Sequence, residues 1–331
     1  MSDSSHDSGF TRRDFIIRST KAGAIIAASG LLSYWLHDSK GPKAISDSGE
    51  SAILLPDFSM PAMGRKMSIV AGDDRVRTVN LALKALGGIE TFIRGGDRVL
   101  IKVNAAFATP AIVSATTNPQ LLAELIRLCY HAGASSVAVT DNPINDPESC
   151  FALTGIGEAA RTAGARLFLP RESFFRATTV PGAAYIVNWP LLYEPFQGIN
   201  KLIGVAPVKD HHRSGASMVM KNWYGLLGGR RNIFHQDIHN LIKELAIMVK
   251  PTFVILDGTT TMMTNGPTGG SLSDLKQTNL MIAATDQVAA DAFGATLLGR
   301  SIHDLPFIAK AEAAGAGTAD YEQIRPERVG I

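Results

Sequence analysis

The chain has 331 residues, of which 46% are hydrophobic and 19% are charged, and its formal net charge is +2. This apolar content is sufficient for a large buried core, so we predict a globular protein. A chain so close to neutral offers no broad basic field, which excludes nucleic acid as the expected partner.

The N-terminal segment carries two adjacent arginines, Arg12 and Arg13, ahead of an uncharged stretch over residues 22–36. This pattern is typical of a twin-arginine export signal, the bacterial route for proteins that fold before translocation. An ordinary amphipathic helix is the alternative, but the stretch has no polar face at helical spacing. We therefore predict a signal or anchor over residues 1–40, the twin-arginine translocation machinery as a partner, and a periplasmic or otherwise exported location.

The fate of this signal is open. An apolar run of about 15 residues is shorter than the roughly 20 that span a bilayer, although Tyr34 and Trp35 suit a membrane interface. The nearest candidate cleavage site, Pro42-Lys43-Ala44, is a poor one. A membrane anchor at residues 22–36 and release into the periplasm both remain possible, and membrane contact is expected only through this segment.

Beyond the signal, residues 41–66 are rich in Ser, Asp, Gly and Pro and lack sustained periodicity, so they are predicted to form a linker. From residue 67, short apolar runs alternate with helical patterns, and we predict a single domain over residues 67–331. The predicted strands cover residues 67–71, 98–103, 137–140, 166–169, 201–206, 253–256 and 280–284. The predicted helices cover residues 75–86, 121–131, 157–163, 218–227, 238–249 and 287–298.

One segment interrupts this order. The turn Val180-Pro181-Gly182-Ala183 separates two extended stretches within residues 175–189, which predicts an inserted β-hairpin. The fold class is therefore α/β, with a mainly parallel sheet, helices on both faces and this hairpin. In such a sheet the ligand crevice lies beyond the carboxyl ends of the strands.

Polar residues follow most of the predicted strands, which suggests one shared pocket at that edge. Taken singly, most such residues are helix caps or turn formers, and Asp286 and Thr117 are the plainest examples. The polar residues that follow the strands are Asn104, Thr116, Thr117, Asn118, Asp141, Asn142, Lys209, Asp210, His211, His212, Asp257, Thr285 and Asp286.

Lys102 differs from these because it interrupts an apolar strand that a doubly covered sheet would bury. A buried lysine needs an anionic partner. Together with Lys209, Lys221 and Asn222 it offers cations and a helix N-terminus to a carboxylate or phosphate. The alternative for each lysine is pairing with a structural carboxylate such as Asp257 or Asp291.

The sequence alone does not decide whether the protein binds a metal. His235 and His239 have i, i+4 spacing but no glutamate beside His235, unlike the HExxH zinc motif. His211 with Asp141 and Asp257 is a second candidate group. The two cysteines, Cys129 and Cys150, are predicted to be separate thiols and cannot hold a four-cysteine iron–sulfur cluster.

Two glycine-rich segments, at residues 225–231 and 265–270, match neither a dinucleotide fingerprint nor a P-loop. Arg230 and Arg231 in the first are either solvated or reach an anion. The second either lets the backbone approach a ligand or forms a surface loop.

In order along the chain, a series of short motifs resembles the domain of unknown function 362 family, over residues 67–299. The motifs are Ile101-Lys102-Val103-Asn104, Thr116-Thr117-Asn118-Pro119, Thr140-Asp141-Asn142-Pro143, Val205-Ala206-Pro207-Val208-Lys209-Asp210-His211, Lys221-Asn222-Trp223-Tyr224-Gly225, Leu256-Asp257-Gly258, Asn265-Gly266-Pro267 and Ala284-Thr285-Asp286-Gln287.

This resemblance implies functional positions at Lys102, Asn104, Asp141, Lys209, His211, Lys221, Asn222, Asp257 and Asn265. Some family members carry a ferredoxin-like iron–sulfur module, and many resemble exported or redox-associated proteins. The present chain lacks the cluster cysteines. It also has Lys209-Asp210-His211-His212 where relatives usually show lysine, threonine and histidine.

The leading hypothesis is an exported protein that binds an anionic small molecule or cofactor in this pocket. Its extension is a redox-associated enzyme that uses acid/base chemistry. The expected catalytic residues are His211, Lys102 and Asp141, and the expected ligand-binding residues are Asn104, Lys209, His212, Lys221, Asn222, Asp257 and Asn265.

Two alternatives remain. One is a non-enzymatic accessory or cofactor-delivery factor for a periplasmic redox system, with a redox protein as partner. The other is a structural partner of a membrane complex that docks through the apolar hairpin within residues 174–196. The sequence leaves open whether the protein is an enzyme, which ligand or metal it binds and its oligomeric state.

Overall fold

The computed structural model describes residues 12–13, 15–17, 19–23 and 53–330, and the chain divides into two units, Met1–Asp47 and Ser48–Ile331. The described residues of the first unit are helical and include Arg12 and Arg13. No helix in the described part of the chain is long and apolar enough to cross a membrane. Residues 24–36 of the predicted anchor lie outside the described residues.

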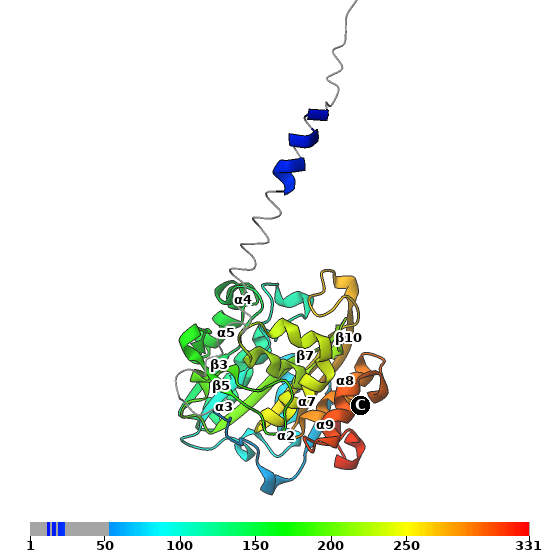
Figure 1. The fold of residues 1–331 in the computed structure, drawn as a ribbon. Helices are drawn as coiled ribbons and strands as arrows, with labels where there is room; N and C mark the ends of the chain where they lie inside the picture. Colours follow the sequence, from blue (N-terminus) through cyan, green and yellow to red (C-terminus); the bar gives the residue numbers. More distant parts are fainter. Residues whose placement is uncertain (1–11, 14, 18, 24–52, 331) are drawn as a thin grey trace, which may run out of the picture. The chain divides into compact units, whose positions relative to one another are not determined.

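The second unit is built on one central sheet (Figure 1). Its strand order is β11 (Glu327–Val329), β1 (Met67–Ala71), β10 (Leu275–Ala284), β9 (Phe253–Met262), β7 (Lys201–His211), β2 (Arg98–Lys102), β3 (Ser136–Thr140) and β4 (Arg166–Phe168), with β8 (Gly215–Ser217) beside β7. Neighbouring strands from β9 through β7, β2 and β3 to β4 are parallel, and β11 is parallel to β1. β10 is antiparallel to both of its neighbours, and the short β8 is antiparallel to β7. This confirms a mainly parallel sheet.

Helices cover both faces of the sheet, as predicted. Alternate strand residues point to opposite faces, so Leu100 and Leu202 enter one core while Ile101 and Ile203 enter the other. The first core is completed by α6 (Val219–Asn222), α7 (Ile238–Met248), α8 (Gln287–Leu297) and α9 (Pro306–Ala313). The second is completed by α2 (Arg75–Ala85), α3 (Pro119–His131), α4 (Pro147–Leu153) and α5 (Ile156–Thr162).

Two helix starts show how local sequence sets the boundaries. The Asp286 side chain accepts hydrogen bonds from the Val288 and Ala289 amides, so its prediction as a cap of α8 is confirmed. At α3 the cap is Asn118, with Pro119 in the first turn. Thr117 was wrongly predicted as a cap, because its hydroxyl instead accepts from the Asn104 amide at 2.8 Å.

β9 is longer than predicted and continues from Leu256 to Met262. Asp257-Gly258 suggested a turn at this point, but the three threonines at residues 259–261 favour extended backbone and pair with the equally extended β10. β7 likewise continues to His211. Asp257 therefore lies within a strand rather than at a strand end.

The predicted hairpin is present as a separate two-stranded antiparallel sheet of β5 (Phe175–Thr178) and β6 (Trp189–Leu192), with its second strand later than expected. Val180, Ile186 and Leu191 from this segment are buried in the domain core. These three side chains are thus already covered, whereas Val187 is 50% exposed. Docking of a partner through this hairpin stays a prediction.

The described chain before β1 also packs against the domain. Phe58 is buried, its amide donates to the Lys250 carbonyl at 3.0 Å, and its carbonyl accepts from the Thr252 hydroxyl at 2.9 Å. The packed chain therefore extends N-terminally of residue 67, into the segment predicted as a linker.

The contact between Gly204 of β7 and the fully buried Trp223 gives a test of this packing. A Cβ atom at Gly204 would lie 2.5 Å from Cη2 of Trp223. We expect Gly204→Ala to lower the free energy of unfolding by about 1–3 kcal/mol through overpacking. Gly95→Ala, where no atom lies within 4 Å, is the matched control and should leave it almost unchanged. Urea denaturation of both variants measures the difference, and equal effects would contradict this packing.

Candidate functional site

A cavity of about 700 Å³ lies at the carboxyl ends of β2, β3 and β7, where the strand-end rule places a ligand crevice. Ile144, Arg213 and Asn232 are exposed at its edge. Nine of the ten predicted site residues line it: Lys102, Asn104, Asp141, Lys209, His211, His212, Lys221, Asn222 and Asn265.

Asp257 is the exception. It lies in the middle of β9, and its carboxylate accepts a hydrogen bond from Nε of Arg75 on α2 at 2.7 Å. Its other oxygen accepts from the Thr259 amide. The prediction that Asp257 belongs to the pocket is wrong, because the unexpected length of β9 places it under the opposite layer of helices.

Lys102 and Asp141 form a buried ion pair in which Nζ lies 2.6 Å from Oδ1. Nζ also donates to the carbonyls of Val103 and Asn222 and to the Asn222 side chain. Asp141 in turn accepts from the amides of Ala105 and Asn142. Both charges are thus fully engaged by the protein, which favours a positioning role over direct contact with a ligand.

The surroundings of this pair are close-packed. A Cβ atom at Gly225 would collide with the Asp141 carboxylate and with Nζ of Lys102. Asn222 donates from Nδ2 to the Val205 carbonyl at 3.1 Å, which orients its oxygen toward Lys102. Burial lowers the pKa of Lys102, and the Asp141 charge opposes that shift. Lys102 therefore pairs with neither Asp257 nor Asp291.

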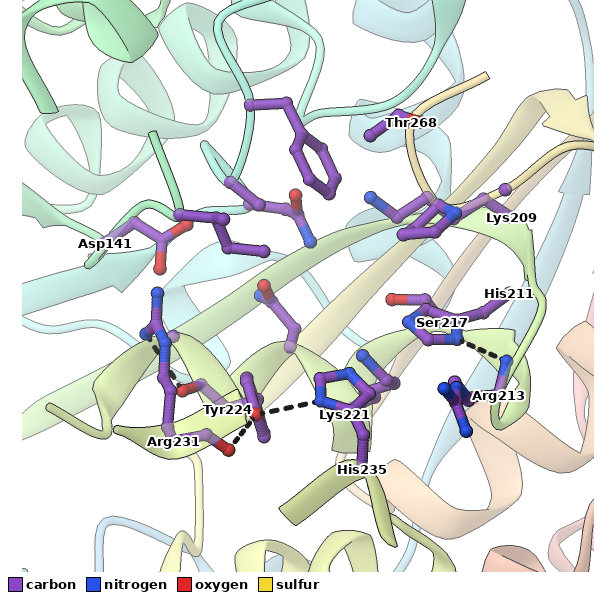
Figure 2. Close-up of a pocket in the computed structure, with 18 of the residues that line it drawn as sticks. Asp141, Lys209, His211, Arg213, Ser217, Lys221, Tyr224, Arg231, His235 and Thr268 are labelled. Atoms are coloured by element: carbon purple, nitrogen blue, oxygen red, sulfur yellow. Dashed lines mark hydrogen bonds between the residues drawn. The ribbon is translucent and has the colours of Figure 1, made fainter. Parts of the chain in front are cut away.

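Lys209 and Lys221 are buried without a carboxylate partner among the residues that the structure describes. Burial, reinforced by neighbouring cations, lowers the pKa of each to about 7. Nζ of Lys209 donates to the Ala115 carbonyl and lies 5.1 Å from the Phe107 ring. Nζ of Lys221 lies 5.2 Å from the Tyr224 ring. Figure 2 shows both lysines among the residues that line the cavity.

Arg231 adds a half-buried cation to the cavity wall, and the sequence left it undecided between a solvated and an anion-binding role. Its guanidinium donates to the carbonyls of Leu227, Asn142 and Pro143 at 2.8–2.9 Å. Carbonyl oxygens fix its position without neutralising its charge. Asp141 is the sole carboxylate among the described residues that line the cavity, and Lys102 already neutralises it.

His211 has a defined protonation state. Its Nδ1 accepts from the backbone amides of Arg213 and Ser214, so the proton resides on Nε2. Burial, followed by the charge of Lys221, lowers the pKa of His211 to about 2. The ring stacks on His212 at 5.0 Å and on His235 at 5.8 Å between ring centroids. At neutral pH His211 is therefore a hydrogen-bond donor rather than a proton acceptor.

The predicted metal groups are not brought together. α7 begins only at Ile238, so His235 lies in the preceding 3-10 helix η8 (Arg231–Asp237) and faces the cavity. His239 instead stacks on Phe307 at 6.1 Å. Within the described ranges, no group of three or more His, Cys, Asp or Glu side chains could hold a metal ion. Cys129 and Cys150 are separate free thiols, as predicted, and both are buried.

The remaining walls are polar and aromatic. Oδ1 of Asn104 is buried and has no hydrogen-bond partner in the described part of the chain. Asn265 donates to Asp274 at 2.6 Å, and the neighbouring Gly266 amide donates to the Asp210 carboxylate, which fixes this loop over β7. Sequence reasoning did not place the following lining residues in the site: Ala106, Phe107, Ile144, Arg213, Ser217, Tyr224, Asn232, His235, Pro267 and Thr268.

Fold and site together define an α/β protein with a cationic pocket at the carboxyl edge of its sheet. The family described as "Domain of unknown function (DUF362)" matches residues 99–296, and the chain belongs to this family. The thylakoid-associated protein sll1697 of Synechocystis sp. is 24% identical over 280 residues, covering 79% of this chain and 81% of that protein.

Among solved structures, the lactate racemase apoprotein from Thermoanaerobacterium thermosaccharolyticum is similar to this chain with a TM-score of 0.38 and 13% identity. The likeness covers 72% of this chain and 60% of that one, so the chain spans less than two thirds of that protein. Similarity at this level carries no argument about activity.

Removing one member of the buried ion pair tests its positioning role. We expect Lys102→Met to lower the free energy of unfolding by about 3–5 kcal/mol, because the Asp141 charge is left buried and unpaired. Lys250→Met removes an exposed lysine that pairs with Asp57 at 3.2 Å and should cost less than about 1 kcal/mol. Urea denaturation measures both variants. A Lys102→Met effect as small as that of the control would contradict the role.

Proposed function

We propose that this protein binds an anionic small molecule or cofactor in the cavity, through Lys209, Lys221 and Arg231. The observation that carries this proposal is the charge imbalance of a buried site. These three cations lack a carboxylate partner among the described residues, while the one carboxylate of the cavity is paired with Lys102. An anion would supply the missing counter-charge.

The cost of this arrangement supports a binding role. Burying an uncompensated ammonium group is unfavourable, and the lowered pKa of Lys209 and Lys221 expresses that cost. A bound carboxylate or phosphate would favour the charged form of the lysine that it contacts. The Nε2 proton of His211 would add a neutral hydrogen bond.

On the same geometry, we assign proton transfer to the lysines rather than to His211. His211 is held neutral, and its Nδ1 is occupied by backbone amides. The groups that change protonation near neutral pH are the two lysines. Proton transfer at this site would therefore use Lys209 or Lys221, with His211 as a fixed hydrogen-bond donor.

Anion binding is measured by titrating the purified protein with oxalate and with inorganic phosphate in a calorimeter. We expect one site per chain. Lys209→Met should weaken binding by about tenfold or more, since a hydrogen bond from a charged group is lost. The control is Lys276→Met, which removes an exposed lysine of β10 and should change nothing. Equal affinities in all three proteins would contradict the proposal.

The affinity should also depend on pH. Both lysines lose their protons as the pH rises through about 7, and binding must then be accompanied by proton uptake. Affinity is therefore expected to fall above about pH 7, by up to roughly tenfold per pH unit for each lysine that is charged in the complex.

We further propose that the protein is exported through the twin-arginine pathway and acts in the periplasm. Support comes from the sequence pattern of Arg12, Arg13 and the apolar residues 22–36. The neutral, fully packed domain is compatible with a route that carries folded proteins.

Cell fractionation tests this location. In a bacterial host with an active twin-arginine system, the wild-type chain should reach the periplasm or the outer side of the inner membrane. Replacing both arginines, Arg12→Lys and Arg13→Lys, keeps the charge but removes the guanidinium pair, and should retain the folded protein in the cytoplasm. The Lys21→Arg variant is the control. Export of the double variant at the wild-type level would refute the assignment.

A further inference from the structure

Among the buried lysines of the cavity, Lys221 is distinguished by a free amino group. Its side chain is 8% exposed and lines the cavity, yet Nζ forms no hydrogen bond or ion pair with any residue that the structure describes. In contrast, Nζ of Lys102 is bonded to Asp141 and Asn222, and Nζ of Lys209 is bonded to the Ala115 carbonyl. Of these three lysines, only Lys221 thus has an amino group without a hydrogen-bond partner among the described residues.

Burial and the charge of Arg231 favour an uncharged amine at Lys221. Arg231 contributes a fixed positive charge, and the Tyr224 ring covers one side of Nζ at 5.2 Å. Burial and the Arg231 charge together lower the pKa of Lys221 to about 7. Near neutral pH a substantial fraction of the amine therefore carries a free electron pair, which is what nucleophilic attack requires.

We propose that Lys221 is a nucleophile that forms an imine with an anionic aldehyde or ketone bound in the cavity. This inference deepens the proposed anion binding and depends on it. Nζ attacks the carbonyl carbon and a C–N bond forms. The two protons of the amine pass to the carbonyl oxygen, which leaves as water and yields the C=N bond. The step needs no oxidant, reductant or metal.

The cavity walls indicate which carbonyl compounds fit. Lys209 and Arg231 can hold a carboxylate or phosphate, and Arg213 at the edge offers another cation. Phe107 and Tyr224 provide apolar surface for a carbon skeleton between the charged groups. The ligand class is therefore an oxo acid or a phosphorylated aldehyde, which share an anionic group close to a carbonyl carbon.

Reductive trapping tests the inference. The full-length protein is incubated separately with pyruvate, 2-oxoglutarate and pyridoxal 5′-phosphate in the presence of cyanoborohydride, which reduces an imine to a stable amine. Intact mass should increase by one ligand per chain with at least one probe, and peptide mapping should place the adduct on Lys221. Pyruvate and 2-oxoglutarate carry a carboxylate, whereas pyridoxal 5′-phosphate carries a phosphate. Comparing their labelling therefore shows which anionic group the cavity accepts.

Lys221→Arg is the informative variant, because it keeps the positive charge but removes the nucleophilic amine. It should lose the adduct, while titration with oxalate or phosphate should still show binding, because Lys209 and Arg231 remain in the cavity. Lys276→Arg, on the exposed surface of β10, should label like wild type. With the probe kept saturating at every pH, labelling should rise with pH and level off above about pH 7, as the Lys221 amine loses its proton.

Three results would overturn the imine. One is no adduct with any probe while oxalate or phosphate still binds, which leaves the proposed anion binding intact. Another is equal labelling of wild type and Lys221→Arg, which assigns the adduct to other lysines. The third is labelling that keeps rising toward pH 10, as it does for a solvated lysine. If no anion binds at all, the proposed function fails, and the imine fails with it.

Discussion

The buried ion pair between Lys102 and Asp141 joins three separate parts of the chain: the end of β2, the residue after β3, and the α6 segment through Asn222. Each partner is fully hydrogen-bonded, so the pair is a fixed cross-link at the carboxyl edge of the sheet. α6 carries Lys221 on the same short helix. The position of the proposed nucleophile therefore depends on this ion pair. It also depends on Gly225, because a side chain at that position would collide with both partners of the pair.

With Asp141 neutralised, the cavity retains an excess of positive charge. Lys209, Lys221 and Arg231 come from β7, α6 and η8, and each is held by packing or by carbonyl oxygens rather than by a carboxylate. Such an arrangement lowers the stability of the empty protein, because buried charges remain unpaired. Unpaired buried charges that lower stability are commonly found at functional sites. We propose that the binding of an anion compensates them here.

Much of the site could be predicted because parallel strands end at one edge of their sheet, and polar residues after apolar runs reveal those ends. Asp141 and Lys209 were found in this way, and Lys102 was found because it interrupts an apolar strand. Asp257 was misplaced because the strand was expected to end at Leu256, whereas β9 continues through the three threonines to Met262. Arg231 and His235 escaped assignment because they lie on a 3-10 segment, which has no periodic pattern to reveal its inward face.

The sequence by itself determined the fold class and the edge of the sheet where the candidate site lies. It also identified nine of the residues that line the cavity, since these follow from apolar periodicity and chain order. It also carries the export pattern at Arg12 and Arg13. Only the tertiary structure decided which lysine is paired and which is free. Lys102, Lys209 and Lys221 have the same chemistry in sequence, and their roles diverge because hydrogen-bond partners from distant segments reach two of them and leave the amino group of Lys221 facing the cavity.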